Sequence, residues 1–358
     1  MKNKEAIVKI AKEVGFSSCS FARLEKNSEG ARLFGEWLQK GFAGEMHYLE
    51  RGQEKRRDPS LVLENAKSVI VLAWDYVAGP AAPHPQIRHR SQGSLLAEFG
   101  GPPVASPAAS SFISRYAWGK DYHEILGEKL SIFQKKLEEI FPGEIFKSYV
   151  DTGPVMEKYW SALGGLGWLG KHTNLIHEKR GSYFLLASLL TTLDFESEAP
   201  VIDRCGTCTR CIDVCPTRAI VAPYVLDARL CISYLTIELK GSIPLELRPL
   251  IGNHVFGCDD CQEVCPWNRH ARLPEEFLRN TSIEQLLEWL SLDEKQFKEK
   301  FRGSPILRSK RRGFLRNVCV VLGNLKDPKS IPALQKAAQD SEPLIREHAQ
   351  WALGKMKI

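Results

Sequence analysis

The spacing of the cysteines restricts this chain more than any other feature. Ten cysteines occur in 358 residues, and eight of them lie between positions 205 and 265. The first group has the spacing of bacterial ferredoxins that carry two [4Fe–4S] clusters: Cys205-x2-Cys208-x2-Cys211-x3-Cys215-Pro216. A shorter group repeats that ending: Cys258-x2-Cys261-x3-Cys265-Pro266. Such crowding indicates ligands of metal clusters rather than disulfides.

The two groups exchange ligands, because the last cysteine of a ferredoxin motif lies on the following helix and reaches the other cluster. The shorter group lacks one cysteine, which Cys231 can supply. We therefore predict one cluster on Cys205, Cys208, Cys211 and Cys265. The other cluster is predicted on Cys215, Cys231, Cys258 and Cys261. Zinc ribbons and buried free thiols are the alternatives, although zinc sites usually use two CxxC pairs. Cys19 and Cys319 lie outside both groups and are expected to be small buried apolar side chains.

The first 194 residues alternate between helical and strand-like patterns. Apolar positions predict a helix that ends near Gly15, strands at 68–74, 145–150 and 183–192, and a helix over 122–141. Pro154 is expected to open a further helix as its first residue. This alternation predicts an α/β domain with helices covering a sheet.

Two further stretches complete the predicted organisation. Residues 78–111 are rich in Pro, Gly, Ser and Ala and predict a long surface loop, either a tolerated insertion or a functional lid. From about 271 the pattern is wholly helical, with two Leu-Gly endings at 322–323 and 353–354 that resemble HEAT-type repeats packed on the preceding domain. We predict domains at 1–194, 195–270 and 271–358.

Composition narrows the class of protein. Hydrophobic residues make up 43% and charged residues 26%, which excludes a fibrous or largely disordered chain. The longest apolar stretch, 183–193, is far shorter than the roughly 20 residues of a membrane helix. Lys9, Lys12 and Glu13 interrupt any signal-peptide core. We expect a cytoplasmic protein without membrane contact, and the net charge of +6 is compatible with a polyanionic partner.

Two weaker motifs do not identify a cofactor. The stretch GGLGWLG at 164–170 lacks the strand-then-GxGxxG order of a dinucleotide site and predicts a tight turn or close backbone approach. Asp121-x-His123 followed by Gly127 is similar to the histidine-ligand motif of some cobalamin enzymes, with one residue too many. We therefore do not expect His123 to ligate cobalt.

Several stretches together resemble the epoxyqueuosine reductase family. They are Arg57-Asp-Pro59, Ser114-Arg-Tyr-Ala-Trp-Gly-Lys-Asp-Tyr-His123, Val150-Asp-Thr-Gly-Pro-Val-Met-Glu157, Gly167-Trp-Leu-Gly-Lys-His-Thr-Asn-Leu175, the run 205–238, and Phe256-Gly-Cys-Asp-Asp-Cys-Gln-Glu-Val-Cys-Pro-Trp-Asn268. The resemblance extends over nearly the whole chain. It departs at His172 and in the stretch 78–111, which is longer than expected for the family.

The resemblance implies an α/β cobalamin-binding domain, a dicluster ferredoxin-like domain and an all-α HEAT-like C-terminal region. The implied activity is reduction of epoxyqueuosine to queuosine at the wobble position of tRNA, the last step of queuosine synthesis. Two clusters feed single electrons to cobalamin, which performs the chemistry on carbon. By its match to the family motif, Asp151 is the implied proton donor. Its position alone also fits a carboxylate that stabilises a helix N-terminus.

The resemblance also implies partners. The cobalamin contacts it suggests, beside Asp151, are Arg57, Tyr116, Lys171, His172, Asn174 and Ser233. His172 also fits a structural histidine. The densest cationic run is the expected tRNA contact: Arg308, Lys310, Arg311, Arg312 and Arg316. As bare charges these residues also fit a solvated face. The target base must leave the anticodon stack. An external one-electron donor such as a flavodoxin or ferredoxin system and a monomeric state are expected.

Two other functions fit parts of the sequence. A reductive dehalogenase-like enzyme would share the clusters and the corrinoid. The basic run near the C-terminus and the absence of an export signal argue against it. A non-enzymatic electron-transfer module would need the clusters alone.

Overall fold

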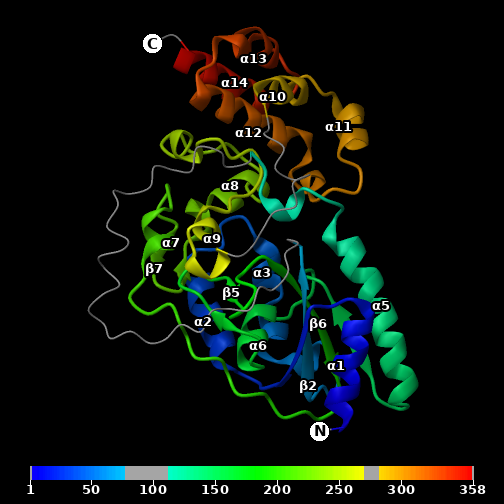
Figure 1. The fold of residues 1–358 in the computed structure, drawn as a ribbon. Helices are drawn as coiled ribbons and strands as arrows, with labels where there is room; N and C mark the ends of the chain where they lie inside the picture. The colour runs from blue at the N-terminus through cyan, green and yellow to red at the C-terminus, as the bar shows by residue number, and fades with distance from the viewer. Residues whose placement is uncertain (1, 77–111, 270–281, 357–358) are drawn as a thin grey trace.

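The structure is a computed structural model that describes residues 2–76, 112–269 and 282–356. Figure 1 shows an N-terminal region built around a sheet, the cysteine-rich segment beside it, and a helical C-terminal region at the opposite end from the N-terminus. The predicted surface loop at 78–111 and the start of the predicted helical region at 271 lie outside the described residues. None of the helices in the described ranges is both long and apolar enough to cross a membrane.

The central sheet has four strands in the order β1-β2-β6-β3, and all neighbours are antiparallel. The strands are β1 (Ser18–Arg23), β2 (Ser68–Asp75), β3 (Phe146–Tyr149) and β6 (Phe184–Thr191). Three of them are the predicted strands, whereas β1 was not predicted. Its polar first half, Ser-Cys-Ser, hides the alternation that identifies a half-buried strand.

Both faces of the sheet are covered, which explains why β2 is almost continuously apolar. Ile70 and Leu72 pack on the face covered by α1 (Lys2–Val14) and α5 (Tyr122–Ile140). Val69 and Val71 pack on the other face with Trp160 of α6 (Glu157–Leu163). Both α1 and α5 agree with the predicted helices. The shorter helices before β2 are α2 (Glu29–Gln39), α3 (His47–Arg51) and α4 (Gln53–Arg57).

The prediction that Pro154 opens a helix is wrong. The helix α6 begins three residues later, at Glu157, because Met156 before it has a non-helical backbone conformation with φ of −89° and ψ of 71°. The glycine stretch after α6 agrees with a close backbone approach. A Cβ on Gly167 would lie 2.2 Å from the carbonyl oxygen of Ile176, across the pairing of β4 (Trp168–Leu169) with β5 (Leu175–Ile176).

The cysteine-rich segment consists of short elements joined by turns. They are α7 (Arg210–Asp213), β7 (Ile220–Ala222), β8 (Val225–Leu226), α8 (Ile232–Ile237) and α9 (Asp260–Glu263). Each cysteine motif contains one short helix that begins one residue before a cysteine: α7 before Cys211 and α9 before Cys261. The two helices contact one another. This pairing brings the two sequence groups together.

The described C-terminal region is helical, as expected, and contains α10 (Ile283–Leu290), α11 (Glu294–Lys300), α12 (Lys310–Leu325), α13 (Ile331–Ala337) and α14 (Pro343–Met356). Its core includes Val255 and Phe256 of the cysteine-rich segment and the fully buried Cys319. Cys19 is partly buried against the core beneath the sheet. The helices therefore pack on the preceding region, as predicted for repeats too few to stand alone.

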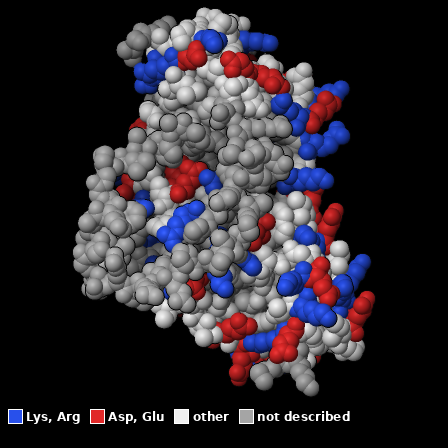
Figure 2. All heavy atoms as spheres, viewed as in Figure 1, with Lys and Arg blue, Asp and Glu red and all other residues white. Residues whose placement is uncertain are grey.

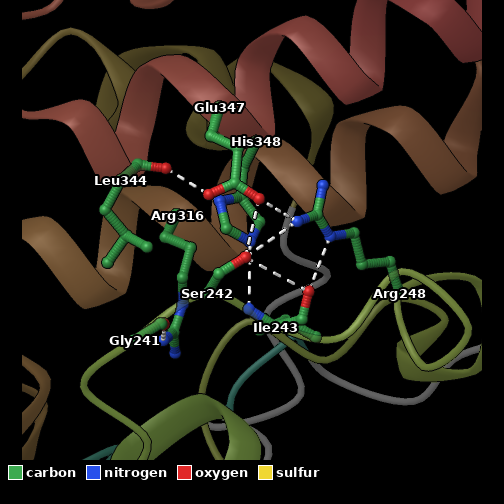
Figure 3. A network of polar contacts seen from close by, with 8 residues as sticks. All are labelled: Gly241, Ser242, Ile243, Arg248, Arg316, Leu344, Glu347 and His348. Carbon is green, nitrogen blue, oxygen red and sulfur yellow. Dashed lines mark hydrogen bonds and ion pairs between the residues drawn. The ribbon is translucent and has the colours of Figure 1, made fainter.

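Polar contacts fasten the last helix to the cysteine-rich segment (Figure 3). Arg248, which is almost inaccessible, forms an ion pair with Glu347 of α14 and donates to the carbonyl oxygen of Ile243 at 2.8 Å. His348 accepts a hydrogen bond from the Ile243 N–H through Nε2 at 3.2 Å. Burial beside Arg248 lowers the pKa of His348 to about 4, so this histidine acts as a neutral acceptor.

A second set of contacts joins α12 to α8. The amide of Asn317 is fully buried and donates to the carbonyl oxygens of Thr236 at 2.7 Å and Val255 at 2.8 Å. Asn324, on the same helix, makes the same kind of bonds to Arg248 and Gly252, but in a partly exposed position. The two asparagines differ mainly in whether water can reach their carbonyl partners and take the place of the amide as hydrogen-bond donor.

We predict that Asn317→Ala lowers the stability of the protein by about 2 kcal/mol, since two buried carbonyl groups lose their partner. Asn324→Ala is the matched control and should cost roughly half as much or less, because water can satisfy its carbonyl partners. Thermal unfolding at one scan rate, followed by circular dichroism, measures both changes. Equal losses in the two variants would show that burial does not decide the effect.

Candidate functional site

The antiparallel order of the sheet brings three chain segments to one edge. The end of β2, the beginning of β6 and the end of β3 lie there, since Asp75 pairs with Phe184 and Tyr149 with Ser188. Asp151 follows β3 directly at this edge. Asp151 was expected to be functional from its match to the family motif, and the structure places it at this end of an antiparallel sheet.

A cavity of about 470 Å³ lies between this edge and the cysteine-rich segment. Its wall on the sheet side includes Tyr76, Phe184 and Leu186, and its opposite wall includes Cys231, Ser233 and Glu238 around α8. Aromatic and aliphatic side chains alternate with a few polar groups, which is the usual composition of a ligand pocket. The cavity therefore joins the predicted proton donor to the predicted cluster ligands.

Asp151 is held at the cavity by its neighbours. Its Oδ2 accepts a hydrogen bond from the Tyr122 hydroxyl at 2.8 Å, and its backbone N–H donates to Glu157 Oε1 at 3.3 Å. His123 Nε2 lies 3.9 Å from the same Oδ2. The Asp151 side chain is 58% exposed, so the space above it is open for a ligand. These contacts aim a carboxyl group into the cavity from a strained backbone position.

Glu157 and Lys158 are two cavity residues that the sequence reasoning missed. Glu157 Oε1 also accepts a hydrogen bond from Ser188 Oγ at 3.2 Å. Burial and the charge of Asp151 raise the pKa of Glu157 to about 8. Lys158 Nζ donates to Asn174 Oδ1 at 3.0 Å, and burial lowers its pKa. Glu157 stands six positions after Asp151 within the quoted motif, and that proximity was the available signal.

The cysteine thiols of the two sequence groups lie close enough to affect one another's pKa. Burial raises the pKa of Cys211 to about 11, and the charges of Cys208, Cys265 and Cys205 contribute to that shift. Burial likewise raises the pKa of Cys261, whose cysteine neighbours include Cys231 and Cys215. Cys258 is a further neighbour of Cys261 and Cys231. Cys211 of the first predicted set is also an electrostatic neighbour of Cys261 of the second, so the assignment of each thiol to a cluster stays a prediction.

The predicted corrinoid contacts fall into two groups. Tyr116, Asn174 and Ser233 line the cavity. The lining formed by the described residues does not include Arg57, Lys171 and His172. Arg57 donates to Asn27, and Lys171 Nζ donates to the carbonyl oxygens of Gly206 and Cys208.

His172 is buried, as a structural histidine would be. Its Nδ1 accepts a hydrogen bond from the Asn174 N–H at 3.1 Å, and burial lowers its pKa to about 4. It orients the loop that carries Asn174 to the cavity.

The predicted tRNA-binding run does not form one basic surface. Arg316 is fully buried, so its prediction as a tRNA contact is wrong. Arg311 is bound to Asp340 and is only 15% exposed, and Arg308 lines the cavity and donates to Glu238. Lys310 and Arg312 remain exposed. The spacing of a charge run in the sequence does not reveal that α12 is buried on all sides from Gly313 to Gly323, which places Arg316 inside the core.

The charged surface is mixed. Figure 2 shows Lys and Arg interspersed with Asp and Glu along the edge formed by α11 and α5, rather than one continuous basic field.

Fold, cavity and paired cysteine sets define a double-cluster iron–sulfur protein with a ligand cavity. Family models match the chain as "4Fe-4S double cluster binding domain" at 204–268, "Epoxyqueuosine reductase QueG, DUF1730" at 56–152 and "HEAT repeats" at 305–357. The epoxyqueuosine reductase of Pseudomonas aeruginosa is 40% identical over 96% of this chain and 91% of its own length. That of Escherichia coli K12 is 35% identical over 95% of this chain and 86% of its own length.

Solved structures agree. One is a crystal structure of epoxyqueuosine reductase with an epoxyqueuosine-modified tyrosine tRNA stem loop, which has a TM-score of 0.82 and 31% identity. The alignment covers 100% of this chain and 91% of that one. The chain belongs to the epoxyqueuosine reductase family.

We predict that Glu157→Gln makes the protein more stable than the wild type as pH rises. Between pH 4.5 and about 8 the folded protein keeps a proton on Glu157 that the unfolded chain releases, so wild-type stability falls as pH rises through this window. Glutamine resembles the protonated carboxyl and removes that dependence. Thermal midpoints at pH 6 and pH 9 measure the effect. Glu64→Gln, at an exposed glutamate, is the control, and a variant-to-wild-type difference independent of pH would contradict the prediction.

Proposed function

We propose that this chain reduces epoxyqueuosine to queuosine in tRNA, with cobalamin in the cavity and two [4Fe–4S] clusters beside it. The observation that carries the proposal is the shared cavity, whose lining includes both Asp151 and Cys231. A proton donor and an electron source thereby reach one ligand from different sides. The family to which the chain belongs supports the same activity.

The reaction fixes what the site has to supply. Removing the epoxide oxygen to leave an alkene consumes two electrons and two protons and releases water. Clusters deliver electrons one at a time, so an external one-electron donor such as a flavodoxin or ferredoxin system reduces the protein. Cobalamin, when bound, supplies a centre that stores electrons and attacks carbon.

The two cysteine sets are the proposed cluster ligands. Cys205, Cys208, Cys211 and Cys265 form one set, and Lys171 supports it by binding carbonyl groups of the same loop. Cys215, Cys231, Cys258 and Cys261 form the other. Because Cys231 lines the cavity, the second set is the one from which electrons enter the cavity.

The cavity suits a corrinoid in its chemistry. Tyr116 and Leu186 offer flat or apolar surface, while Ser233 and Asn174 offer hydrogen bonds to peripheral amides. Lys158 fixes the Asn174 amide through its Oδ1, so the amide nitrogen is directed away from Lys158. These residues of the described lining are the proposed cobalamin contacts.

Asp151 is the proposed acid. Its Oδ2 is bound by the Tyr122 hydroxyl, which leaves Oδ1 for the departing epoxide oxygen. A bound cofactor and substrate would cover the exposed carboxyl group and exclude water from it. Tyr122 orients the carboxyl group, and Glu157 holds the backbone that carries it.

The substrate reaches this cavity as a base removed from the anticodon stack. Arg308 lines the cavity, and Lys310 and Arg312 lie exposed at the start of α12 just after it. We propose that these three cations, rather than the whole run, contact the RNA backbone. A tRNA substrate places the activity in the cytoplasm, and the chain acts as a monomer.

Neither alternative function gains support. A dehalogenase-like enzyme requires small organohalides, and a simple electron-transfer module does not require a ligand cavity next to a cysteine set. Every curated relative named above is an epoxyqueuosine reductase.

We predict that Asp151→Asn retains corrinoid and iron but lowers the rate of queuosine formation by about 100-fold or more, the usual value of a general acid. Tyr122→Phe should lower it less, because the carboxyl group remains. Anaerobic single turnover with epoxyqueuosine-bearing tRNA measures both rates. Asp194→Asn, at an exposed carboxylate paired with Arg23, is the control. Full activity of Asp151→Asn would exclude the acid role.

Salt dependence tests the RNA contacts. The double variant Lys310→Gln/Arg312→Gln should weaken tRNA binding and reduce the slope of log Kd against log salt by roughly 0.7–0.9 per lost phosphate contact. Lys298→Gln/Lys329→Gln removes the same charge from exposed cations paired with Glu294 and Glu284. Equal slopes in the two double variants would exclude Lys310 and Arg312 as contacts.

A further inference from the structure

His254 lies beside Cys258 of the second cysteine set and has no role in the proposed reduction of epoxyqueuosine. It is 6% exposed and follows the turn Pro249–Ile251, where its backbone N–H donates to the Ile251 carbonyl oxygen at 3.2 Å. Its side chain points toward the start of α9. Nε2 lies 3.2 Å from Asp260 Oδ2 and 3.8 Å from Cys258 Sγ.

The surroundings of this histidine fix its tautomer. Asp260 is the first residue of α9 and its side chain is only 14% exposed, so its carboxylate needs a buried donor. A proton on Nε2 satisfies Asp260 and points the same N–H toward the Cys258 sulfur. The contact is therefore a shared N–H between an oxygen and a sulfur acceptor.

A hydrogen bond to a cluster thiolate changes the energy of the cluster. Reduction adds negative charge, and an N–H directed at a ligand sulfur stabilises that charge and raises the reduction potential. A buried carboxylate nearby has the opposite effect. Cys258 belongs to the set whose Cys231 lines the cavity, so a donor to Cys258 acts on the cluster from which electrons leave for the cavity.

We propose that His254 is a positioning residue for the second cluster: its Nε2–H bonds the Cys258 sulfur, raises the reduction potential of that cluster, and is held in place by Asp260. The inference rests on the proposed cluster ligands. It assigns the two side chains opposite effects, since His254 stabilises added negative charge and Asp260 opposes it. If the two residues had only a structural role, replacing either one would not shift the reduction potential of the cluster in opposite directions.

A different site at the same residues has to be distinguished. The ligand atoms of His254, Cys258 and Asp260 lie within 4.8 Å of one another, which is compatible with a single metal ion. Such an ion would compete with a cluster for Cys258. Metal analysis separates the two cases, because a mononuclear site adds one metal ion that His254→Leu loses.

The test is a redox titration of the full chain, reconstituted anaerobically with iron and sulfide and without cobalamin, followed by electron paramagnetic resonance. His254→Leu should make reduction of one cluster at least about threefold less favourable, a downward shift of roughly 28 mV at 59 mV per tenfold change for one electron. Asp260→Asn should shift the same cluster upward. The other cluster should stay unchanged in both variants, and His47→Leu, at an exposed histidine, should move neither.

His254→Gln guards against failure of assembly, because its amide retains an N–H near the sulfur. It should bind eight irons and give a potential between those of the wild type and His254→Leu. Unchanged potentials in both His254 variants, shifts of the same sign at His254 and Asp260, or an extra metal ion lost with His254 would each overturn the proposal. A wild-type chain that assembles no clusters would instead overturn the proposed function.

Discussion

A buried cation fastens the site together. Arg316 has no solvent-exposed surface, and its guanidinium donates to the carbonyl oxygens of Leu235, Leu239 and Gly241, at and beyond the last turn of α8. The last carbonyl groups of a helix lack hydrogen-bond partners within the helix and carry partial negative charge. A buried guanidinium at that end supplies both the hydrogen-bond donors and a positive charge. Because α8 begins directly after Cys231 and carries Ser233, this contact makes α12 a support for one wall of the cavity.

The proposed proton donor and the proposed electron source lie on different sides of the cavity. Asp151 comes from the loop after β3, whose backbone is held in a left-handed conformation by the bond to Glu157. The second cysteine set comes from the other side, through Cys231. No single segment contains both. The antiparallel sheet, the ferredoxin-like turns and the C-terminal helices have to pack together before the proposed acid, Asp151, and the proposed cluster ligand, Cys231, line one cavity.

Local patterns predicted what is decided locally. The apolar run at 68–74 predicted a strand, and β2 lies there. Cysteine spacing predicted two thiol sets because short turns fix which sulfurs can converge, and that assignment stays a prediction. Contacts between distant segments were not predictable in this way. The same sequence run contains Arg312, which is exposed, and Arg316, which is fully buried, and only the packing of α12 on α8 distinguishes them. The start of α6 at Glu157 rather than Pro154 likewise depends on the backbone conformation of Met156, which the sequence pattern does not reveal.

In the proposed function, a corrinoid bound in the cavity lies next to the second cluster. Electron paramagnetic resonance of the chain loaded with clusters and Co(II) cobalamin tests it directly, through the relaxation rate of the cobalt signal before and after reduction of the clusters. We expect faster cobalt relaxation once the clusters are paramagnetic, and a smaller effect in Cys231→Ala, which lacks a proposed ligand of the nearer cluster. Cobalt relaxation that is indifferent to the state of the clusters would contradict it.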